Sequence, residues 1–361
     1  MTAIVIAAGG TAGHVMPALA VAEELVLRGA TVSFAGTPGR VEASLVPQAG
    51  YPFDGFQVDG LERRPSFKLV RALARDAAAP VACARILRRR QADAVLGGGG
   101  FVAGPMLAAA RALRLPSVLT EADAHLGLAN RLAAPLARRV FLAFPIDGRD
   151  GDRYRVVGRP VARRFFDAQR TDARRALELP DDAFVLAAFG AFAGALRVNL
   201  AVADAFGDGS LDGIVLHLSG TRDLEEVRAR VTAPADRYRL SATTEHFERV
   251  LAAADLCIAR AGGSVFELAA CGAPAILIPY PYATADHQAH NAEHFRSAGG
   301  AIVVRDAELD PAELRRQVQQ LQADPARLAS MAAAMRGEAR PDAAADVAVE
   351  LLRLADDRQD A

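Results

Sequence analysis

The sequence predicts an α/β protein of two Rossmann-like, doubly wound domains with a cleft between them. At 361 residues the chain exceeds the ~250 to 300 residues at which a single hydrophobic core usually stops growing. Apolar runs typical of buried strands alternate with amphipathic helical segments throughout the chain. Several of these runs end in glycine-rich loops, as do the strands of parallel sheets that bind nucleotides.

The first half of the chain carries one series of this alternation. Strands are expected at residues 3–8, 31–35, 94–96, 117–120 and 140–143, and helices at residues 17–28 and 105–113. Connections between parallel strands are right-handed, so these runs predict a parallel sheet with helices on both faces. We expect the first domain to span residues 1–160, with a hinge at Gly158 and Pro160.

A second series begins after the hinge. Strands are expected at residues 185–189, 214–218, 256–259 and 275–279, and helices from about residue 195 and at 223–231 and 264–271. This pattern predicts a second parallel sheet, in a domain that spans residues 161–340. We expect residues 341–361 to form a helix that returns to the first domain and then a frayed polar tail.

Composition and charge exclude several classes of protein. A net charge of −1 gives the whole chain no general attraction to nucleic acid. The three cysteines lie far apart without metal-ligand spacing, which favours buried thiols in a reducing compartment. The first ten residues lack the features of a signal peptide, and no segment offers the ~18 to 20 apolar residues of a membrane span. The expected compartment is the cytoplasm.

Four loops that follow expected strands could bind phosphate. They are "AAGGTAGH" (7–14), "LGGGGFVAGP" (96–105), "FGAFAGA" (189–195) and "ARAGGSVFEL" (259–268). Glycine lets the backbone approach a ligand, and the helix N-terminus that follows presents N–H groups to an anion. None of the loops fits the GxGxxG or GxxxxGK[ST] pattern, so neither a dinucleotide-dependent dehydrogenase nor a P-loop NTPase is favoured. The alternative for each loop is an ordinary strand-to-helix turn.

Other candidates are single polar residues at helix entrances. His14 could accept a proton from a hydroxyl near neutral pH, or be a structural histidine. Glu267, one turn into a helix, could bind a ribose diol or compensate the helix dipole. In "ADHQAHNAEH", Asp286 and Gln288 could bind a sugar. The three histidines of that segment share a helical face, so a metal site is a further, less favoured alternative.

The segment from Arg63 to Arg90 is strongly basic. It holds nine arginines and lysines, interleaved with apolar residues, against the single acid Asp76. A basic amphipathic segment of this kind can lie on an anionic bilayer. A solvated helix face is the alternative. Nucleic acid is disfavoured because stacking aromatic residues are nearly absent there.

Taken in order, the loops resemble those of the MurG family, the bacterial N-acetylglucosaminyltransferases that convert lipid I to lipid II. The matching segments are "GGTAGHVMPALAVAEEL", "GGGFVAGP", "TEADAHLGLANRLAAPLARRVFLAFP" and "RAGGSVFELAACGAPAILIPYPYATADHQAHNAEHFRSAGGA". The resemblance runs from residue 4 to about residue 354. It implies a GT-B fold, a role in peptidoglycan synthesis, and a peripheral position on the cytoplasmic face of the bacterial cell membrane.

The resemblance also implies a reaction and its substrates. UDP-GlcNAc would be held mainly by the second domain, and undecaprenyl-pyrophosphate-linked MurNAc-pentapeptide, lipid I, would approach the first domain at the membrane. The C4 hydroxyl of MurNAc would displace UDP with inversion and form a β-1,4 linkage. Neither a metal nor another cofactor is implied. The anionic membrane surface would be contacted through Arg63 to Arg90.

Carried over motif by motif, the resemblance implies roles for individual residues. His14 would be the catalytic residue that helps to deprotonate the acceptor. Donor contacts are expected from Thr11, Gly13, Asp123, Arg163, Gly190, Phe192, Gly262, Gly263, Ser264, Glu267, His287 and Gln288. Acceptor contacts are expected from Gly10, Thr11, Gly99, Gly100 and Gly104.

The chain departs from the family pattern at several places. Phe192 stands where the family has a serine that meets the donor phosphate. Ala162 replaces an arginine, which leaves Arg159 or Arg163 as a substitute, and Asp123 replaces an asparagine. Phe192 and Ala162 motivate one alternative to the transferase, a degenerate, non-catalytic protein that binds UDP-sugars. A UDP-GlcNAc 2-epimerase on the same kind of two-domain scaffold is another alternative.

Overall fold

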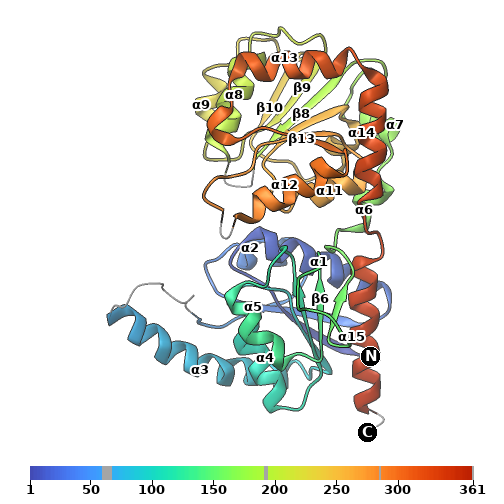
Figure 1. Cartoon of the computed structure of the whole chain (residues 1–361). Coiled ribbons are helices and arrows are strands. Elements are labelled where there is room, and N and C mark those ends of the chain that lie inside the picture. Colours follow the sequence, from blue (N-terminus) through green and yellow to red (C-terminus); the bar gives the residue numbers. More distant parts are fainter. Residues whose placement is uncertain (59–66, 191–193, 284–285, 360–361) are drawn as a thin grey trace. The chain divides into compact units, whose positions relative to one another are not determined.

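The computed structural model describes the chain except for residues 59–66, 191–193, 284–285 and 360–361 (Figure 1). Two compact units form the molecule. Unit 1 comprises Met1–Ala162 together with Arg340–Ala361, and unit 2 comprises Arg163–Ala339. Each unit holds one parallel sheet with helices packed on it, so the predicted fold class of two doubly wound α/β domains is confirmed.

In the described part of unit 1, seven parallel strands form the sheet in the order β3-β2-β1-β4-β5-β6-β7. The strands are β1 (Ala3–Ala7), β2 (Thr31–Gly36), β3 (Phe53–Gly55), β4 (Ala94–Gly97), β5 (Ser117–Glu121), β6 (Arg139–Leu142) and β7 (Tyr154–Val156). The helices are α1 (Ala12–Leu27), α2 (Glu42–Gln48), α3 (Phe67–Arg89), α4 (Ala103–Ala112), α5 (Leu128–Ala133), the short 3-10 turn Ala134–Leu136 and α15 (Ala343–Gln359). Helix α15 packs on α1 and β4, within unit 1.

In the described part of unit 2, six parallel strands have the order β10-β9-β8-β11-β12-β13. The strands are β8 (Val185–Phe189), β9 (Ile214–Leu218), β10 (Tyr238–Ser241), β11 (Leu256–Ala259), β12 (Ala275–Leu277) and β13 (Ala301–Val303). The helices are α6 (Arg163–Asp167), α7 (Arg170–Ala176), α8 (Leu196–Phe206), α9 (Leu224–Arg228), α10 (Phe247–Ala253), α11 (Val265–Cys271), α12 (His287–Ser297), the 3-10 turn Asp306–Glu308, α13 (Pro311–Gln322) and α14 (Pro325–Gly337).

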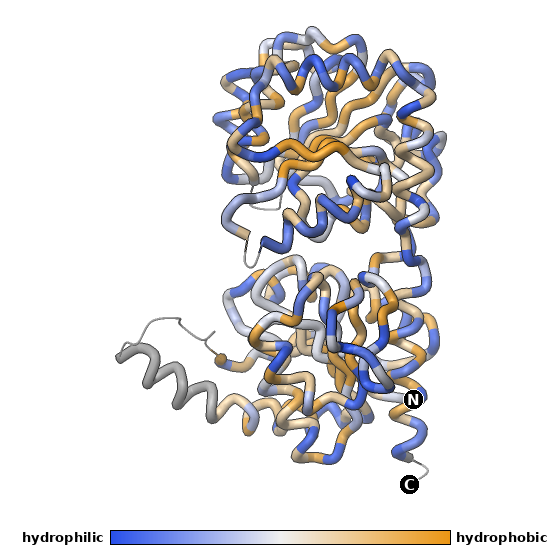
Figure 2. Tube along the Cα trace, viewed as in Figure 1, coloured by the Kyte–Doolittle hydropathy of each residue, from blue (hydrophilic) through white to orange (hydrophobic). Residues whose placement is uncertain are grey.

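Both sheets are apolar on both faces, as parallel sheets covered by helices must be. The strands form apolar interiors in each unit (Figure 2), and β1, β5, β8 and β11 are buried almost end to end. In unit 1, α3 and α4 close one face over residues such as Cys83, Leu87 and Met106. The core needs this continuous burial, because hydrophobic transfer is the main term that offsets the entropy of folding.

The strand order reverses direction once in each sheet. In unit 1 the reversal lies between β1 and β4, and in unit 2 between β8 and β11. At such a point two loops leave the carboxyl ends of neighbouring strands in opposite directions, which opens a crevice for a ligand. The four glycine-rich loops follow these four strands. The topology therefore puts two of the loops together in each unit.

Helix α1 begins earlier than the sequence predicts. The expected start was residue 17, because proline is favoured in the first turn of a helix, but the helix starts at Ala12 and contains Pro17. His14 and Val15 both have backbone N–H groups that donate to the Thr11 carbonyl, at 3.1 and 3.3 Å. His14 therefore sits within the first helical turn and not in the preceding loop.

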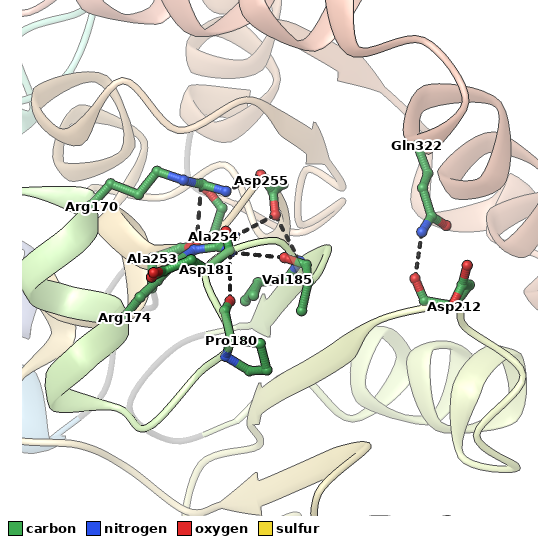
Figure 3. Close-up of polar contacts among 11 residues, drawn as sticks. Arg170, Arg174, Pro180, Asp181, Val185, Asp212, Ala253, Ala254, Asp255 and Gln322 are labelled. Atoms are coloured by element: carbon green, nitrogen blue, oxygen red, sulfur yellow. Dashed lines mark hydrogen bonds and ion pairs between the residues drawn. The ribbon is translucent and has the colours of Figure 1, made fainter.

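In unit 2, a buried arginine of α7 bonds both the segment before β8 and the segment before β11 (Figure 3). Arg174 on α7 is 1% exposed and donates to the carboxylate of Asp255 at 2.8 Å and to the carbonyls of Pro180, Asp181, Ala183 and Ala253. The same carboxylate accepts from the backbone N–H of Val185, at the start of β8, at 2.7 Å. A buried guanidinium is tolerated here because its donors are satisfied.

Candidate functional site

A buried carboxylate holds the loop after β1 in place. Glu42, the first residue of α2, is 0% exposed and accepts from the backbone N–H of Gly10 at 3.0 Å and of Thr37 at 3.1 Å. A Cβ at Gly9 would lie 2.4 Å from Glu42 Oε1, and Gly10 has a φ of +87°. Only glycine fits both positions, so the sequence and the carboxylate together define one loop conformation.

The loop after β4 packs against the first one. Gly99 and Gly100 have φ values of +99° and +79°. A Cβ at Gly99 would lie 2.7 Å from Cδ2 of His14, and a Cβ at Gly100 would lie 2.2 Å from the Gly9 carbonyl oxygen. The absence of side chains at these two glycines is what admits the His14 ring. Gly104, also predicted for the acceptor, lies on α4 with open space around its Cα.

The hydrogen bonds of His14 define its tautomer. Nδ1 lies 3.2 Å from the carbonyl oxygen of Gly9 and 3.3 Å from Oγ1 of Thr11. A carbonyl can only accept, so Nδ1 carries the proton and donates it to Gly9. Nε2 then has a lone pair, and no hydrogen bond of Nε2 is found among the described residues. This nitrogen can take a proton from a substrate.

The surroundings of His14 keep its imidazole neutral. Burial is the main cause that lowers the pKa of His14 below its ordinary 6.5, and the positive charge of Arg159 lowers it further. The carboxylates of Asp123 and Glu42 act in the opposite direction. Because the lowering causes prevail, the ring is unprotonated at neutral pH, as a general base requires.

The loop after β5 has a buried carboxylate of its own. Glu121 is 4% exposed and accepts from the backbone N–H groups of Asp123 and Gly127, both at 3.1 Å, and from the side chain of Asn130 at 2.9 Å. Burial raises the pKa of Glu121. These bonds hold Asp123, one of the predicted donor contacts, in the same unit as His14.

The loop after β8 in unit 2 is also closed by an acid. Gly194 has a φ of +96°, and a Cβ there would lie 2.3 Å from Oδ2 of Asp223. Asn199 donates to that same oxygen at 3.0 Å and to the Ser219 carbonyl at 2.7 Å. A Cβ at Gly190 would lie 2.2 Å from Cβ of Ala195, so the strand end admits only glycine. Phe192 lies outside the described residues.

The loop after β11 leads directly into α11. Gly262 and Gly263 precede Ser264, which is the N-cap residue of that helix, and Glu267 lies in its first turn. A Cβ at Gly262 would lie 3.7 Å from Nε2 of Gln288. The structure therefore brings the predicted glycines and the predicted glutamine of α12 together.

Helix α12 carries the predicted sugar contacts at its start. Gln288 Oε1 accepts from the backbone N–H of Tyr280 at 3.0 Å, which leaves its Nε2 group to donate. His287 precedes it as the first residue of the helix. Asp286 is the N-cap residue with a φ of +55°, but its side chain forms no capping hydrogen bond. Asn291, buried one turn later, donates to the Ala261 carbonyl at 3.1 Å and ties α12 to the loop after β11.

The two arginines considered as phosphate ligands lie in different settings. Arg163 is exposed on α6, and its Nε lies 3.7 Å from the carboxylate of Asp167. Arg159 is 6% exposed and donates to the carbonyl oxygens of Gly13, at 2.5 Å, and Ala122, at 3.3 Å. Arg159 therefore belongs to the surroundings of His14 in unit 1.

The basic segment is only partly available to a surface. At its end, Arg89 and Arg90 both bind Asp54, at 2.5 and 2.6 Å. Among the described side chains of α3, those of Ala78, Val81, Arg85, Arg88 and Arg89 are exposed. Arg63 and Arg64 lie outside the described residues, as do the side chains of Lys68, Arg71 and Arg75.

Neither a metal-binding cluster nor a membrane-spanning helix occurs in the part of the chain that the structure describes. No group of three or more His, Cys, Asp or Glu side chains there is arranged to hold a metal ion. Of the predicted histidine cluster, His294 bonds the carboxylate of Glu338 at 2.8 Å. No helix within the described ranges combines the length and apolarity that crossing a membrane requires.

Comparison with known proteins gives the family. Residues 4–142 match the glycosyltransferase family 28 N-terminal domain, and residues 190–347 match the glycosyltransferase family 28 C-terminal domain. The chain belongs to glycosyltransferase family 28, a class that agrees with two doubly wound units and glycine loops at both strand-order reversals.

Relatives within the family are more specific. The UDP-N-acetylglucosamine–N-acetylmuramyl-(pentapeptide) pyrophosphoryl-undecaprenol N-acetylglucosamine transferase of Acidithiobacillus ferrooxidans is 40% identical over 367 residues, 98% of each chain. The enzyme of the same name from Mycobacterium tuberculosis is 40% identical over 368 residues, 98% of this chain and 89% of the relative. Among solved structures, MurG of Acinetobacter baumannii has a TM-score of 0.76 and 28% identity, and the match covers 98% of this chain and 100% of that one. The predicted resemblance to the MurG family is confirmed.

One solved structure bears on the isomerase alternative. UDP-GlcNAc 2-epimerase from Neisseria meningitidis matches with a TM-score of 0.67 but 13% identity, over 98% of this chain and 100% of that chain. At this identity the match shows a shared fold alone.

Sequence reasoning did not identify the acids that support the loops. Glu42, Glu121 and Asp223 were not among the predicted residues, yet each is buried. Glu42 accepts a hydrogen bond from the loop after β1, Glu121 from the loop after β5, and Asp223 from Asn199 on α8. The sequence signal that could have identified these acids is their position at the ends of strands and the starts of helices. Glu121 ends a strand, while Glu42 and Asp223 stand at the start of the helices that follow β2 and β9.

Proposed function

We propose that this chain transfers N-acetylglucosamine from UDP-GlcNAc to the C4 hydroxyl of the MurNAc residue in lipid I, which yields lipid II. The observation that carries the proposal is the 40% identity, over 98% of both chains, to a transferase named for this donor and acceptor. The 2-epimerase alternative has only a shared fold in its favour.

His14 is the proposed general base. Its Nε2 accepts the proton of the C4 hydroxyl while the C4 oxygen forms a bond to the anomeric carbon of the donor sugar. The bond from that carbon to the phosphate oxygen breaks, and UDP departs with the bonding electron pair. A single displacement inverts the anomeric configuration and gives a β-1,4 linkage. The bond from Nδ1 to the Gly9 carbonyl supports this role, because it fixes the tautomer that the reaction needs.

The loops of unit 2 are the proposed donor site. Negative charge grows on the departing diphosphate, and backbone N–H groups at Gly262, Gly263 and Ser264 would stabilise it. Glu267 would accept hydrogen bonds from the ribose hydroxyls. The Nε2 group of Gln288 would donate to the N-acetylglucosamine, which its bond to Tyr280 supports by fixing the orientation of the amide.

The acceptor is proposed to bind through unit 1, at the cytoplasmic face of the cell membrane. Gly10 and Thr11 after β1, and Gly99 and Gly100 after β4, would approach the acceptor diphosphate. The exposed face of α3, with Val81, Arg85 and Arg88, would contact the anionic lipid surface. The opposite face of this helix is buried on α4, which supports a peripheral contact through the exposed face.

The central experiment is a transfer assay with purified protein, UDP-GlcNAc and a lipid I analogue. The expected result is release of UDP together with a disaccharide lipid. Wild-type protein that binds UDP by calorimetry but makes no product would contradict the proposal and favour the non-catalytic protein. Conversion of UDP-GlcNAc without lipid, to its 2-epimer, would favour the isomerase.

Binding to vesicles tests the membrane contact separately. Vesicles that contain anionic phospholipid should sediment the wild-type protein, and the double variant Arg85→Glu, Arg88→Glu should bind several-fold more weakly at low salt. The matched control is Arg175→Glu, Arg228→Glu, which reverses two exposed arginines of unit 2. Equal weakening in both variants would reject α3 as the contact.

A further inference from the structure

Proline inside α1 leaves a carbonyl oxygen without its helical partner. The N–H of residue 17 would normally donate to the carbonyl of Gly13, but proline has no N–H. Arg159 fills this gap, because its Nη2 donates to the Gly13 oxygen at 2.5 Å. A side chain that comes from beyond β7 therefore completes the first turn of α1, the turn that contains His14.

The same guanidinium reaches a second loop. Nη1 of Arg159 donates to the carbonyl oxygen of Ala122 at 3.3 Å. Ala122 lies between Glu121, whose carboxylate holds the loop after β5, and Asp123. The backbone before Arg159 is itself held, since the N–H groups of Val157 and Gly158 both donate to the Leu142 carbonyl, at 3.1 and 3.3 Å.

We propose that Arg159 is a positioning residue, which joins the first turn of α1 to the loop after β5 through the carbonyl that Pro17 leaves open. The inference deepens the proposed function, in which His14 is the base, and therefore rests on it. The role rests on the bonds from its Nη1 and Nη2 groups to two protein carbonyls of unit 1.

The charge of Arg159 supports the same role. Three charged groups act on His14: Arg159 beyond β7, Asp123 after β5 and Glu42 on α2. The two carboxylates favour the imidazolium, and Arg159 disfavours it. Arg159 thus both fixes the turn that presents His14 and opposes the carboxylates that would protonate it.

The test is titration of the His14 ring by NMR in the full-length protein, with the signal assigned by its loss in His14→Ala. In Arg159→Met the positive charge is gone, so the pKa of His14 should rise. The acid limb of the kcat profile should move to higher pH with it, and kcat should fall about tenfold, the effect of one charged hydrogen bond. Calorimetric affinity for UDP should stay unchanged.

Two variants complete the design. Arg159→Lys keeps the charge but has no fork to reach both carbonyls, so the titration should stay near that of the wild type while kcat falls. Arg153→Met removes an exposed arginine of the same unit and should change neither quantity.

An unchanged kcat or an unchanged His14 titration in folded Arg159→Met would overturn the inference. If Arg159→Met fails to fold, Arg159→Gln replaces it as the uncharged variant, and equal titrations in Gln and Lys variants would overturn the inference equally. A wild-type protein without transfer activity would instead reject the proposed function, while the NMR titration would still report on Arg159.

Discussion

Two histidines, one in each unit, show how hydrogen bonding can separate two imidazoles whose pKa is lowered by burial. His217 on β9 lies 2.6 Å from the Tyr238 hydroxyl through Nδ1 and 3.1 Å from Oδ1 of Asn199 through Nε2. Because the amide oxygen only accepts, Nε2 carries the proton and Nδ1 accepts from the tyrosine. His14 has the opposite tautomer, with a bonded Nδ1 and a lone pair on Nε2.

Burial lowers the pKa of both histidines, to about 4 for His217. A lowered pKa alone therefore does not identify a base. The difference lies in the second nitrogen. Both ring nitrogens of His217 are hydrogen-bonded to neighbouring side chains, whereas Nε2 of His14 has no hydrogen bond to a described residue, as the proposed base requires. His217 belongs to the scaffold below the Gly194 loop, through Asn199 and Asp223.

The largest effect should come from His14→Ala. Loss of a general base lowers kcat by about 10²- to 10⁴-fold. The free energy of unfolding should change by less than about 1 kcal/mol, since the ring lies at a half-buried helix end. Transfer assays and chemical denaturation measure the two quantities, with His246→Ala, an exposed histidine of unit 2, as the control. A large stability loss with little change in kcat would make His14 a structural histidine, as His217 is.

Arg174→Met should cause the largest loss of stability among these variants, because Arg174 is buried and hydrogen-bonded throughout. The substitution removes a positive charge that pairs with Asp255 and leaves several carbonyls without a hydrogen-bond donor. The free energy of unfolding should therefore fall by about 3 kcal/mol. Exposed Arg175, one residue along α7, gives the matched control, and Arg175→Met should cost less than about 0.5 kcal/mol. Similar losses in the two variants would show that the buried network has no special weight.

His217 predicts a distinct pH dependence of stability. Its pKa is about 4 in the fold and about 6.5 in the unfolded chain. The unfolded state therefore binds the proton more tightly between these values. The stability that His217 contributes as a neutral side chain is complete above pH 6.5. About 3 kcal/mol of this stability is lost as the pH falls to 4.

Denaturation at several pH values checks this slope. In His217→Gln the amide can still donate to Asn199 but does not titrate, so the difference from wild type should shrink between pH 6.5 and pH 4. A pH-independent difference would show that His217 keeps its proton affinity on folding.

The sequence predicted the fold because periodicity reports burial directly. Alternating apolar runs located β1, β8 and β11 nearly to the residue, and glycines marked the four loops. The predicted start of α1 was wrong, because proline is favoured in the first turn of a helix and Pro17 was therefore placed at the start. The sequence alone does not show the contacts that let Pro17 lie inside the helix.

The side chains that hold the loops in place could not be predicted from the sequence, because they are distant from the loops in the chain. Glu42 and Arg159 contact loops 32 and 146 residues away in the chain, and only the completed sheet brings them there. The sequence shows which residues are polar, but local patterns do not reveal which carbonyl or N–H group each polar side chain will bond.

The smallest expected effect is that of Thr11→Val, which sharpens the orientation of His14. Thr11 is the exposed N-cap residue of α1 with extended backbone, a conformation that suits valine, and its side chain forms no capping bond. Its hydroxyl lies 3.3 Å from Nδ1 of His14. Loss of one neutral hydrogen bond is worth about 0.5 to 1.5 kcal/mol, so kcat/KM should fall roughly two- to tenfold without a change in stability.

Thr11→Ser keeps the hydroxyl and should retain wild-type activity in the same assay. Full activity of Thr11→Val would mean that the Gly9 carbonyl alone orients the ring. A loss of a hundredfold or more would be too large for one neutral bond to the ring, and would assign Thr11 a direct contact with the reacting groups. The size of this effect therefore separates a hydroxyl that steadies the base from one that touches the substrate.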